Sequence, residues 1–371
     1  MISLKPCSML FLILIAGSAS IADETNSAVY GRGNDAYTTS GGIAQEKNVI
    51  FMTWPSGAGK GERWLVSIDV AKPEQPALLG KLPLDGFPQD LAITGTHAFV
   101  VNGIELLVID ISNPASPALI KRLPMADATI RGPQGIDIKD AMAYLACRRG
   151  GVKAVDISNP REPKIVASCG IPGFARDVTV IQDFLYVAND TKGIHILGIE
   201  TSGRFKDFGR FAVPRGCIGH IRATGETAYL SGGDTLVTTV SIKEASKPIF
   251  LGSTDDRNIL SPLYGSYSHD LSLMETFDKA TGAKRVYACV VDGESGLIVT
   301  DVSSPDMPVF TGELMEGVKV GSPYVLTGIC LRGTTAYVID DMYGMRVIDI
   351  STPIKPVLIG EGVCLTHSKQ K

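Results

Sequence analysis

Short apolar runs separated by turn-forming residues dominate the chain after residue 40. Between residues 90 and 123, four such runs follow one another, at residues 90–93, 98–101, 105–111 and 117–123. Gly, Asn, Asp and Pro stand between runs that are rich in β-branched and aromatic residues, which is the signature of strands joined by hairpins. The runs carry no helical periodicity. The stretch therefore predicts four antiparallel strands.

The same pattern recurs along the chain, marked by the phrase Val-Ile-Asp-Ile-Ser-Asn-Pro, which begins at the end of the third run. Five copies keep its aspartate, at Asp69, Asp110, Asp156, Asp301 and Asp349, and two degenerate copies place Gly198 and Ser241 there. Asp, Ser and Asn side chains bond to nearby backbone in turns, and Pro fixes φ. The phrase therefore predicts a structural turn and no catalytic role for its aspartates.

Seven units of four short strands predict an all-β fold, a single seven-bladed β-propeller of four-stranded antiparallel blades over residues 41–365. Radial repetition leaves only short, protected sheet edges. A two-sheet sandwich would not explain a repeated unit.

The repeated phrase, together with residues 173–178 (GFARDV) that open a unit and residues 185–188 (LYVA) inside it, resembles the LVIVD repeat family of exported proteins. The resemblance covers nearly the whole chain that follows residues 1–22. It implies a propeller-like shape and a surface or periplasmic role, without fixing an activity.

Residues 1–22 have the layout of a secretory signal peptide. Lys5 precedes an apolar run at residues 9–16, and small residues lead to cleavage sites after Ala19 or Ala22. The apolar run is too short to span a membrane. We expect an exported protein, periplasmic, secreted or at the cell surface, with no membrane span after cleavage. Residues 23–40 form an N-terminal segment that closes the propeller in one interpretation, and residues 366–371 form a polar tail.

The composition of the chain limits the classes of partner that we expect. The formal net charge of −4 gives no electrostatic footprint for nucleic acid. Six cysteines follow the predicted signal peptide; their pairing is left open, and we expect most of them to be small buried apolar side chains. We expect a monomer.

Alignment of the units places residues from several blades around the predicted channel, where the innermost strands begin. Aromatic residues from the entering loops flank them, and the ring could bind a polar ligand such as a sugar or peptide. The predicted ligand-binding residues at this channel mouth are Gln89, Asp90, Gln134, Arg176, Asp177, His220, Tyr267, His269, Asp270 and Tyr324.

We assign no catalytic residue and no cofactor, because the chain contains no recognisable nucleophile–base or metal-ligand motif. A channel-bound metal ion stays open: the aspartates Asp90, Asp177 and Asp270 would suit Ca²⁺, whereas His220 and His269 would favour Zn²⁺ or copper.

The leading hypothesis is a binding or protein-interaction module outside the cytoplasm, with a protein, saccharide or peptide ligand. It would use the channel mouth and the loops inserted in unit six, at residues 253–268, 276–284 and 313–323. The alternative is a propeller enzyme, a saccharide lyase or hydrolase or a metal-dependent oxidase, with His220, His269 and Arg176 as its acid–base and charge-neutralising groups.

Overall fold

The structure is a computed structural model that describes residues 41–54, 63–125, 132–200, 203–214, 218–232, 235–254, 268–278, 280–292, 295–315, 326–340 and 344–362. The chain divides into two units, residues 1–38 and 39–371, and every described residue belongs to the second. The predicted signal peptide, the segment 23–40 and the tail 366–371 lie outside the described residues. Among the described residues, no helix is long and apolar enough to cross a membrane.

The described ranges form seven antiparallel sheets, each built from four strands that follow one another in sequence. Blades 1 to 4 contain β1 (Ile43–Glu46), β2 (Val49–Trp54), β3 (Arg63–Asp69), β4 (Ala77–Leu84); β5 (Pro88–Thr94), β6 (His97–Asn102), β7 (Glu105–Asp110), β8 (Ala118–Pro124); β9 (Gly135–Lys139), β10 (Met142–Ala146), β11 (Val152–Asp156), β12 (Lys164–Cys169); β13 (Asp177–Ile181), β14 (Phe184–Ala188), β15 (Ile194–Ile199), β16 (Phe205–Phe211). Blades 5 to 7 contain β17 (His220–Thr224), β18 (Thr227–Gly232), β19 (Thr235–Ser241), β20 (Ile249–Ser253); β21 (Ser268–Phe277), β22 (Lys284–Asp292), β23 (Gly296–Asp301), β24 (Val309–Leu314); β25 (Leu326–Arg332), β26 (Thr335–Asp340), β27 (Gly344–Asp349), β28 (Val357–Gly362).

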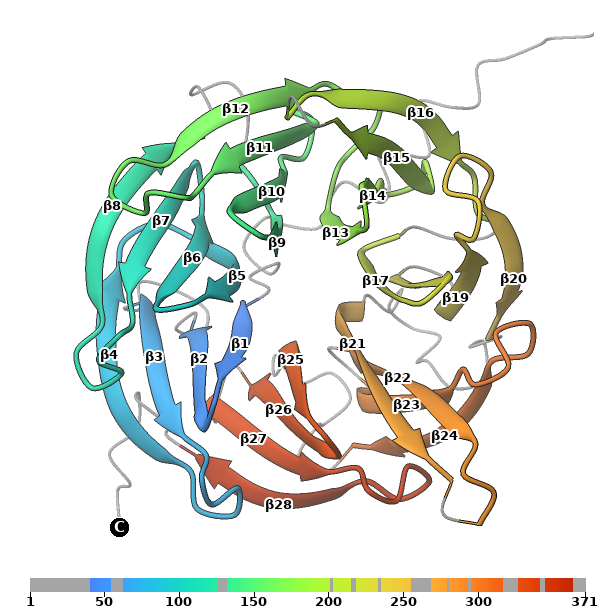
Figure 1. The fold of residues 1–371 in the computed structure, drawn as a ribbon. Coiled ribbons are helices and arrows are strands. Elements are labelled where there is room, and N and C mark those ends of the chain that lie inside the picture. The colour runs from blue at the N-terminus through green and yellow to red at the C-terminus, as the bar shows by residue number, and fades with distance from the viewer. Residues whose placement is uncertain are drawn as a thin grey trace, which may run out of the picture. The chain divides into compact units, whose positions relative to one another are not determined.

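The blades stand in a ring, with the first strand of each blade at the centre and the fourth at the rim (Figure 1). This confirms the predicted all-β, seven-bladed propeller. The middle strands are buried on both faces, so their alternating side chains pack against both neighbouring blades. One apolar cluster lies at each junction between blades; the cluster between blades 1 and 2, for example, joins Phe51 and Leu65 to Val100 and Leu107.

The ring closes between blades 7 and 1 by the same kind of packing. Met52 and Trp54 of β2 meet Tyr337 and Ile339 of β26 in a fully buried cluster. All four strands of blade 1 come from residues 43–84, and all four of blade 7 from residues 326–362. Closure among the described residues therefore needs no strand exchange between the chain ends.

The repeated aspartate caps its own turn, as predicted. The Asp110 carboxylate accepts the Ser112 N–H at 2.8 Å, and Asp301 and Asp349 accept the corresponding Ser303 and Ser351 N–H groups at 2.8 Å. Strand registers pair Asp110 with His97, Gly198 with Phe184 and Ser241 with Thr227. His97, Phe184 and Thr227 are each the first residue of the second strand in their blade. The alignment of the two degenerate copies is therefore confirmed.

The turn also binds the preceding blade. The Ser67 hydroxyl of blade 1 donates to the carbonyl of Pro114 in the turn of blade 2, and Thr239 of blade 5 donates likewise to Pro305 of blade 6. Gly80 on the outer strand lies so close that a Cβ there would stand 2.6 Å from the Pro114 carbonyl oxygen. Because an ordinary side chain could not fit, glycine at this place lets successive blades approach.

The described cysteines Cys147, Cys169, Cys289 and Cys330 carry free thiols. Cys147 and Cys289 are buried in the apolar junctions between blades, which confirms the predicted role for these two. Burial raises the pKa of both thiols to about 12, so they stay protonated at neutral pH.

Candidate functional site

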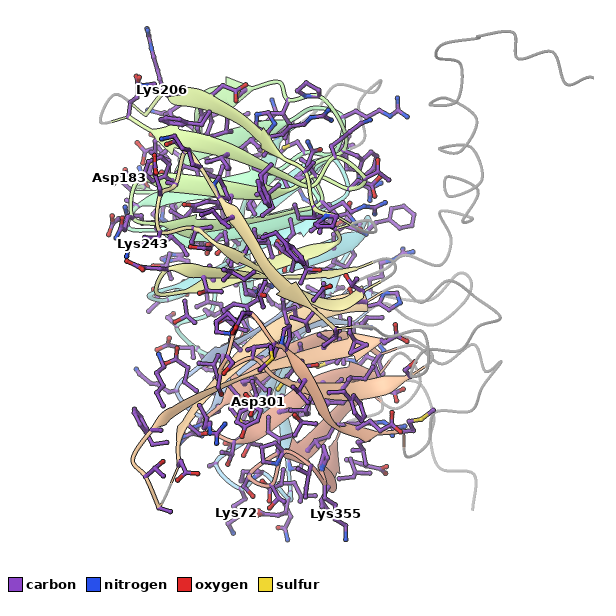
Figure 2. All side chains as sticks on the ribbon, turned by 90° about the vertical axis from the view of Figure 1, so that its right-hand side faces the viewer. Lys72, Asp183, Lys206, Lys243, Asp301 and Lys355 are labelled. Atoms are coloured by element: carbon purple, nitrogen blue, oxygen red, sulfur yellow. The ribbon has the colours of Figure 1, made fainter. Side chains whose placement is uncertain are left out.

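The inner strands begin on one face of the ring, which we call the mouth face. The opposite, far face carries the turns between the first and second strands and the repeated aspartate turns. Asp183, in the β13–β14 turn, and Lys243, in the turn after β19, lie at the same edge of the ring in side view (Figure 2).

The inner-strand alignment made from the sequence is confirmed by strand register. Asp90 pairs with Val101, Gly135 with Ala146, Asp177 with Ala188 and His220 with Ser231, each partner lying four residues into its second strand. Residues far apart in sequence therefore occupy equivalent places around the axis.

These residues enclose one small cavity of about 20 Å³ at the mouth face, which we call the mouth cavity. Its lining comes from all seven blades and includes every described member of the predicted ring: Gln89, Asp90, Gln134, Arg176, Asp177, His220, His269 and Asp270. Gly41, Gly135, Arg222 and Thr327 complete it. The predicted aromatic members Tyr267 and Tyr324 lie outside the described residues.

The ring aspartates hold neighbouring blades together. Asp177 accepts the N–H of Val178, on its own strand, at 2.8 Å and that of Ile221, on the next blade, at 3.1 Å. Asp90 bridges in the same way to Ile136 of blade 3 at 3.0 Å, and Asp270 to Ile329 of blade 7 at 3.0 Å. Three predicted ligand residues thus have a structural role that the sequence alignment did not indicate.

Arg222, which the sequence analysis missed, is the centre of the site. Its guanidinium donates to Asp177 Oδ2 at 2.7 Å and to Asp270 Oδ1 at 3.1 Å, and so joins carboxylates from blades 4 and 6. We call Asp90, Asp177, Arg222 and Asp270 the polar layer. The signal for Arg222 was in the alignment, because the equivalent inner-strand positions carry small residues such as Ala92, Thr179 and Ser272.

The polar layer sets the protonation of its members in opposite directions. Burial disfavours the Asp177 charge, but Arg222 and His220 outweigh it and lower the pKa of Asp177 to about 2. Burial and the charge of Asp177 raise the pKa of Asp90 to about 8. At neutral pH, Asp177 is therefore ionised and Asp90 is largely protonated.

Two imidazoles stand beside this layer. His220 Nδ1 lies 3.7 Å from Asp177 Oδ2 and 3.9 Å from Asp270 Oδ1. Desolvation, followed by repulsion from His220, lowers the pKa of His269 to about 4, so His269 is a neutral imidazole near pH 7. The neutral ring offers one donor and one acceptor to a ligand.

Arginines and phenylalanines border the mouth. Arg176 pairs with Asp190 at 3.2 Å, and its guanidinium stands 5.0 Å from the Phe174 ring centroid. The Phe174 loop is held by Asn189, whose side chain accepts the Phe174 N–H at 2.7 Å and donates to the Pro172 carbonyl at 2.8 Å. Cation–π stacking on a loop fixed in this way presents a rigid polar and aromatic rim.

Two polar atoms in the lining have no hydrogen-bond partner among the residues that the structure describes. The Gln134 Oε1 atom and the Thr327 Oγ1 atom are buried without a hydrogen bond, and Thr327 is only 2% exposed. Unpaired buried polar atoms are rare because each costs desolvation free energy. Their position in the mouth cavity leaves them available to a ligand.

Within the described ranges, no three His, Cys, Asp or Glu side chains lie close enough together to hold a metal ion. The ring aspartates direct their oxygens at backbone N–H groups and at Arg222. This donor arrangement does not resemble an oxygen cage for Ca²⁺.

The inserted hairpin of unit six lies away from the mouth. The strands β21 and β22 begin and end near the mouth face, at Ser268 and Asp292, and extend to the pair Phe277 and Lys284 at the opposite end. The other two inserted loops fall largely outside the described residues. Of the three, the hairpin at residues 276–284 therefore does not share a face with the mouth cavity.

Comparison with protein families agrees with the repeat. The profile of the LVIVD repeat matches residues 85–123, 132–170, 172–202, 285–316 and 327–362, which belong to blades 2, 3, 4, 6 and 7. The chain is an LVIVD repeat protein. Blade 5, which carries Ser241 in place of the turn aspartate, and blade 1, whose copy is looser, are unmatched. Comparison with curated proteins gives no match.

Solved structures share the fold of this LVIVD repeat protein at low sequence identity. A protein from Lactobacillus plantarum aligns with a TM-score of 0.64 and 12% identity, over 85% of this chain and 97% of that one. The periplasmic gluconolactonase of Pseudomonas aeruginosa aligns with a TM-score of 0.62 and 13% identity, over 85% and 96%. A functionally unknown protein from Desulfotomaculum acetoxidans aligns with 0.58 and 14%, over 87% and 98%. At these identities the likeness concerns the fold alone.

Proposed function

We propose that this LVIVD repeat protein is an exported binding module that takes a small polar ligand, a saccharide or the end of a peptide, at the mouth of its channel. The observation that carries the proposal is the convergence of Gln134, His269 and Thr327, from three blades, on one cavity with two unpaired polar atoms. A site of this kind fixes a ligand by hydrogen bonds from rigid elements.

The size of the mouth cavity decides how such a ligand would bind. About 20 Å³ accommodates roughly one water molecule or one protruding polar group. A hydroxyl or carboxylate would therefore enter the cavity, while the rest of the ligand would lie against the rim of Phe174 and Arg176. Aromatic faces and a guanidinium suit the apolar face of a sugar ring or a peptide carboxylate.

The mature chain, residues 23–371, tested on glycan and peptide arrays identifies the ligand. Titration of the hits then compares His269→Ala and His220→Ala with His97→Ala, a matched histidine at the start of β6, near the far face. We expect each mouth variant to lose about tenfold or more in affinity, since a buried hydrogen bond contributes about 1.5 kcal/mol. Unchanged affinity in both mouth variants would contradict the proposal that the ligand binds at the mouth.

A second candidate, an enzyme that uses the same mouth, is favoured by His220. An imidazole that faces two carboxylates in a polar cavity is a fitting general base. The array hits should then be followed for turnover, with metal analysis of the purified protein. Turnover that is lost in His220→Ala while binding survives would assign the enzyme; binding without turnover would assign the module.

Export is the other half of the proposal and is tested separately. Its support is the predicted signal peptide at residues 1–22 together with membership of the LVIVD repeat family. We expect the protein in the periplasm or the medium with a mature N-terminus after Ala19 or Ala22. Recovery of the intact chain from the cytosol would contradict this.

A further inference from the structure

A second and much larger cavity lies on the far side of the polar layer. It has a volume of about 740 Å³, within the range of small-molecule sites, and we call it the far chamber. Asp90, Arg222 and Asp270 line both the far chamber and the mouth cavity. The polar layer therefore divides the channel into two spaces, and only the far one is of ligand size.

Small side chains create the space. Two residues after the aligned position of each inner strand stand Ala44, Ala92, Thr179, Ser272 and Cys330, with Asp137 and Arg222 as the two larger members, and all seven line the chamber. Interiors of proteins are normally close-packed, so a ring of small residues that leaves a space of this size needs a reason. Thr179 and Ser272 contribute hydroxyl groups to the wall from blades 4 and 6.

The charged side chains that line the chamber differ in how far other groups of the protein already bind them. Asp137 gives its two oxygens to the N–H groups of Ile138 and Val180, each at 2.8 Å. Asp270 binds Arg222, and Asp90 is largely protonated at neutral pH. The cations Lys47 and Arg332 stand in the same lining near the far face, on adjacent blades. Lys47 shares an exposed ion pair with Glu46 at 3.9 Å, but Glu46 lies outside the lining. The charges that the lining presents at the opening of the chamber are therefore the two cations.

We propose that the far chamber is a second binding site, for a small hydroxylated carboxylate such as a sugar acid. Lys47 and Arg332 bind the carboxylate at the opening, and the Thr179 and Ser272 hydroxyls, with the Gln45 amide, bind the hydroxyl groups inside. The polar layer is the floor of the site. This inference is independent of the ligand at the mouth.

Ligand-observed saturation-transfer NMR and calorimetry with D-glucuronate, D-galacturonate and D-glucose test the proposal on the mature protein. Glucose matches glucuronate except for the carboxylate. We expect the two acids to bind and glucose to bind about tenfold more weakly or not at all. Binding of the acids should weaken as salt is raised, because the cations are solvent-accessible. Absence of saturation transfer from both acids would overturn the proposal.

Variants locate the binding. Lys47→Gln and Arg332→Gln should each weaken glucuronate binding about threefold, whereas Lys72→Gln, an exposed lysine in the repeated turn of blade 1, should not. Ser272→Leu and Ala92→Leu fill the chamber from different blades and should abolish binding. His269→Ala, in the mouth cavity, should leave it unchanged, which separates this site from the proposed function. Equal affinity in Lys72→Gln and in the Lys47→Gln, Arg332→Gln double variant would contradict the proposal even if the filled variants failed to fold.

Discussion

Arg222 shows how a single side chain organises the channel. Its guanidinium satisfies carboxylates from two blades, and these carboxylates in turn accept backbone N–H groups of the next blades. A buried carboxylate is stable as an anion only when it is paired and hydrogen-bonded. Removal of one partner leaves the other in a costly state.

Asp177→Asn should therefore destabilise the protein by about 2–3 kcal/mol. The amide keeps the size of the side chain, but it loses the charge that binds Arg222 and places an NH₂ group against a backbone N–H. Asp183→Asn is the matched control in the same blade, because Asp183 is exposed and pairs only with Lys139 at 3.3 Å among the contacts described. It should change the free energy of unfolding by less than about 0.5 kcal/mol. Urea unfolding measures both; equal effects would contradict the structural role of Asp177.

Asp90 makes stability depend on pH. Its folded pKa of about 8 exceeds the ordinary 3.8, so between these values the folded protein keeps a proton that the unfolded chain releases. Raising the pH from 5 to 8 therefore favours unfolding through this group. Relative to Asp90→Asn, the wild type should lose stability by at most about 1.4 kcal/mol per pH unit. Parallel urea midpoints for the two proteins at pH 5, 6.5 and 8 would show that Asp90 is ionised throughout.

Residue identities in the ring were predictable, but their contacts were not. Counting strand positions from the repeated aspartate placed Asp90, Asp177 and His220 correctly around the axis. The same counting could not show that the Asp177 oxygens turn toward Ile221 and Arg222, because that depends on how closely two blades approach. Arg222 lies two residues further along its inner strand than the aligned His220, outside the set of positions compared between units.

At the scale of the element, the repeated turn is both a cap and a contact between blades. The sequence predicts that the aspartate caps the turn, because Asp followed by Ser or Lys and then Pro is typical of turns. The contact of the turn with the outer strand of the preceding blade involves two units, so the sequence of a single unit does not predict it. Outer strands carry glycine where the next turn arrives, as Gly80, Gly252, Gly312 and Gly360 show.

Gly80→Ala should cost about 1–3 kcal/mol, because the added methyl group would overlap the carbonyl oxygens of Pro114 and Ala115, each 2.6 Å from the new Cβ. Gly170→Ala, after β12, is the control, since a Cβ there meets no atom within 4 Å. It should stay within about 0.5 kcal/mol of the wild type. Thermal unfolding distinguishes the two; a neutral Gly80→Ala would mean that the blades are further apart than described.

At the scale of the whole molecule, the ring depends on the junction between blades 7 and 1. The number of blades follows from the sequence, because each of the seven repeated units contains four short strands and so predicts one blade. How the ring closes does not follow, because the sequence left open a strand supplied by residues 23–40. In the described part, apolar packing of Trp54 and Ile339 joins the two blades.

Ile339→Ala should therefore cost as much as the same change inside the ring. Ile298, in the junction between blades 5 and 6, is also fully buried, and both substitutions should lower the free energy of unfolding by about 2–5 kcal/mol. Chemical unfolding of the two variants is the measurement. A much smaller loss for Ile339→Ala would indicate an open or loosely closed ring.

The claim that the mouth is a ligand site is tested most directly by calorimetric titration of the mature protein and its Gln134→Leu, Thr327→Val double variant with the ligand that the arrays identify. These substitutions remove the two unpaired polar atoms and leave in place the hydrogen bonds that the ring aspartates make between blades. A ligand site at the mouth predicts an affinity loss of about tenfold or more in the double variant, with unchanged or increased stability. Equal affinity for the two proteins would contradict it.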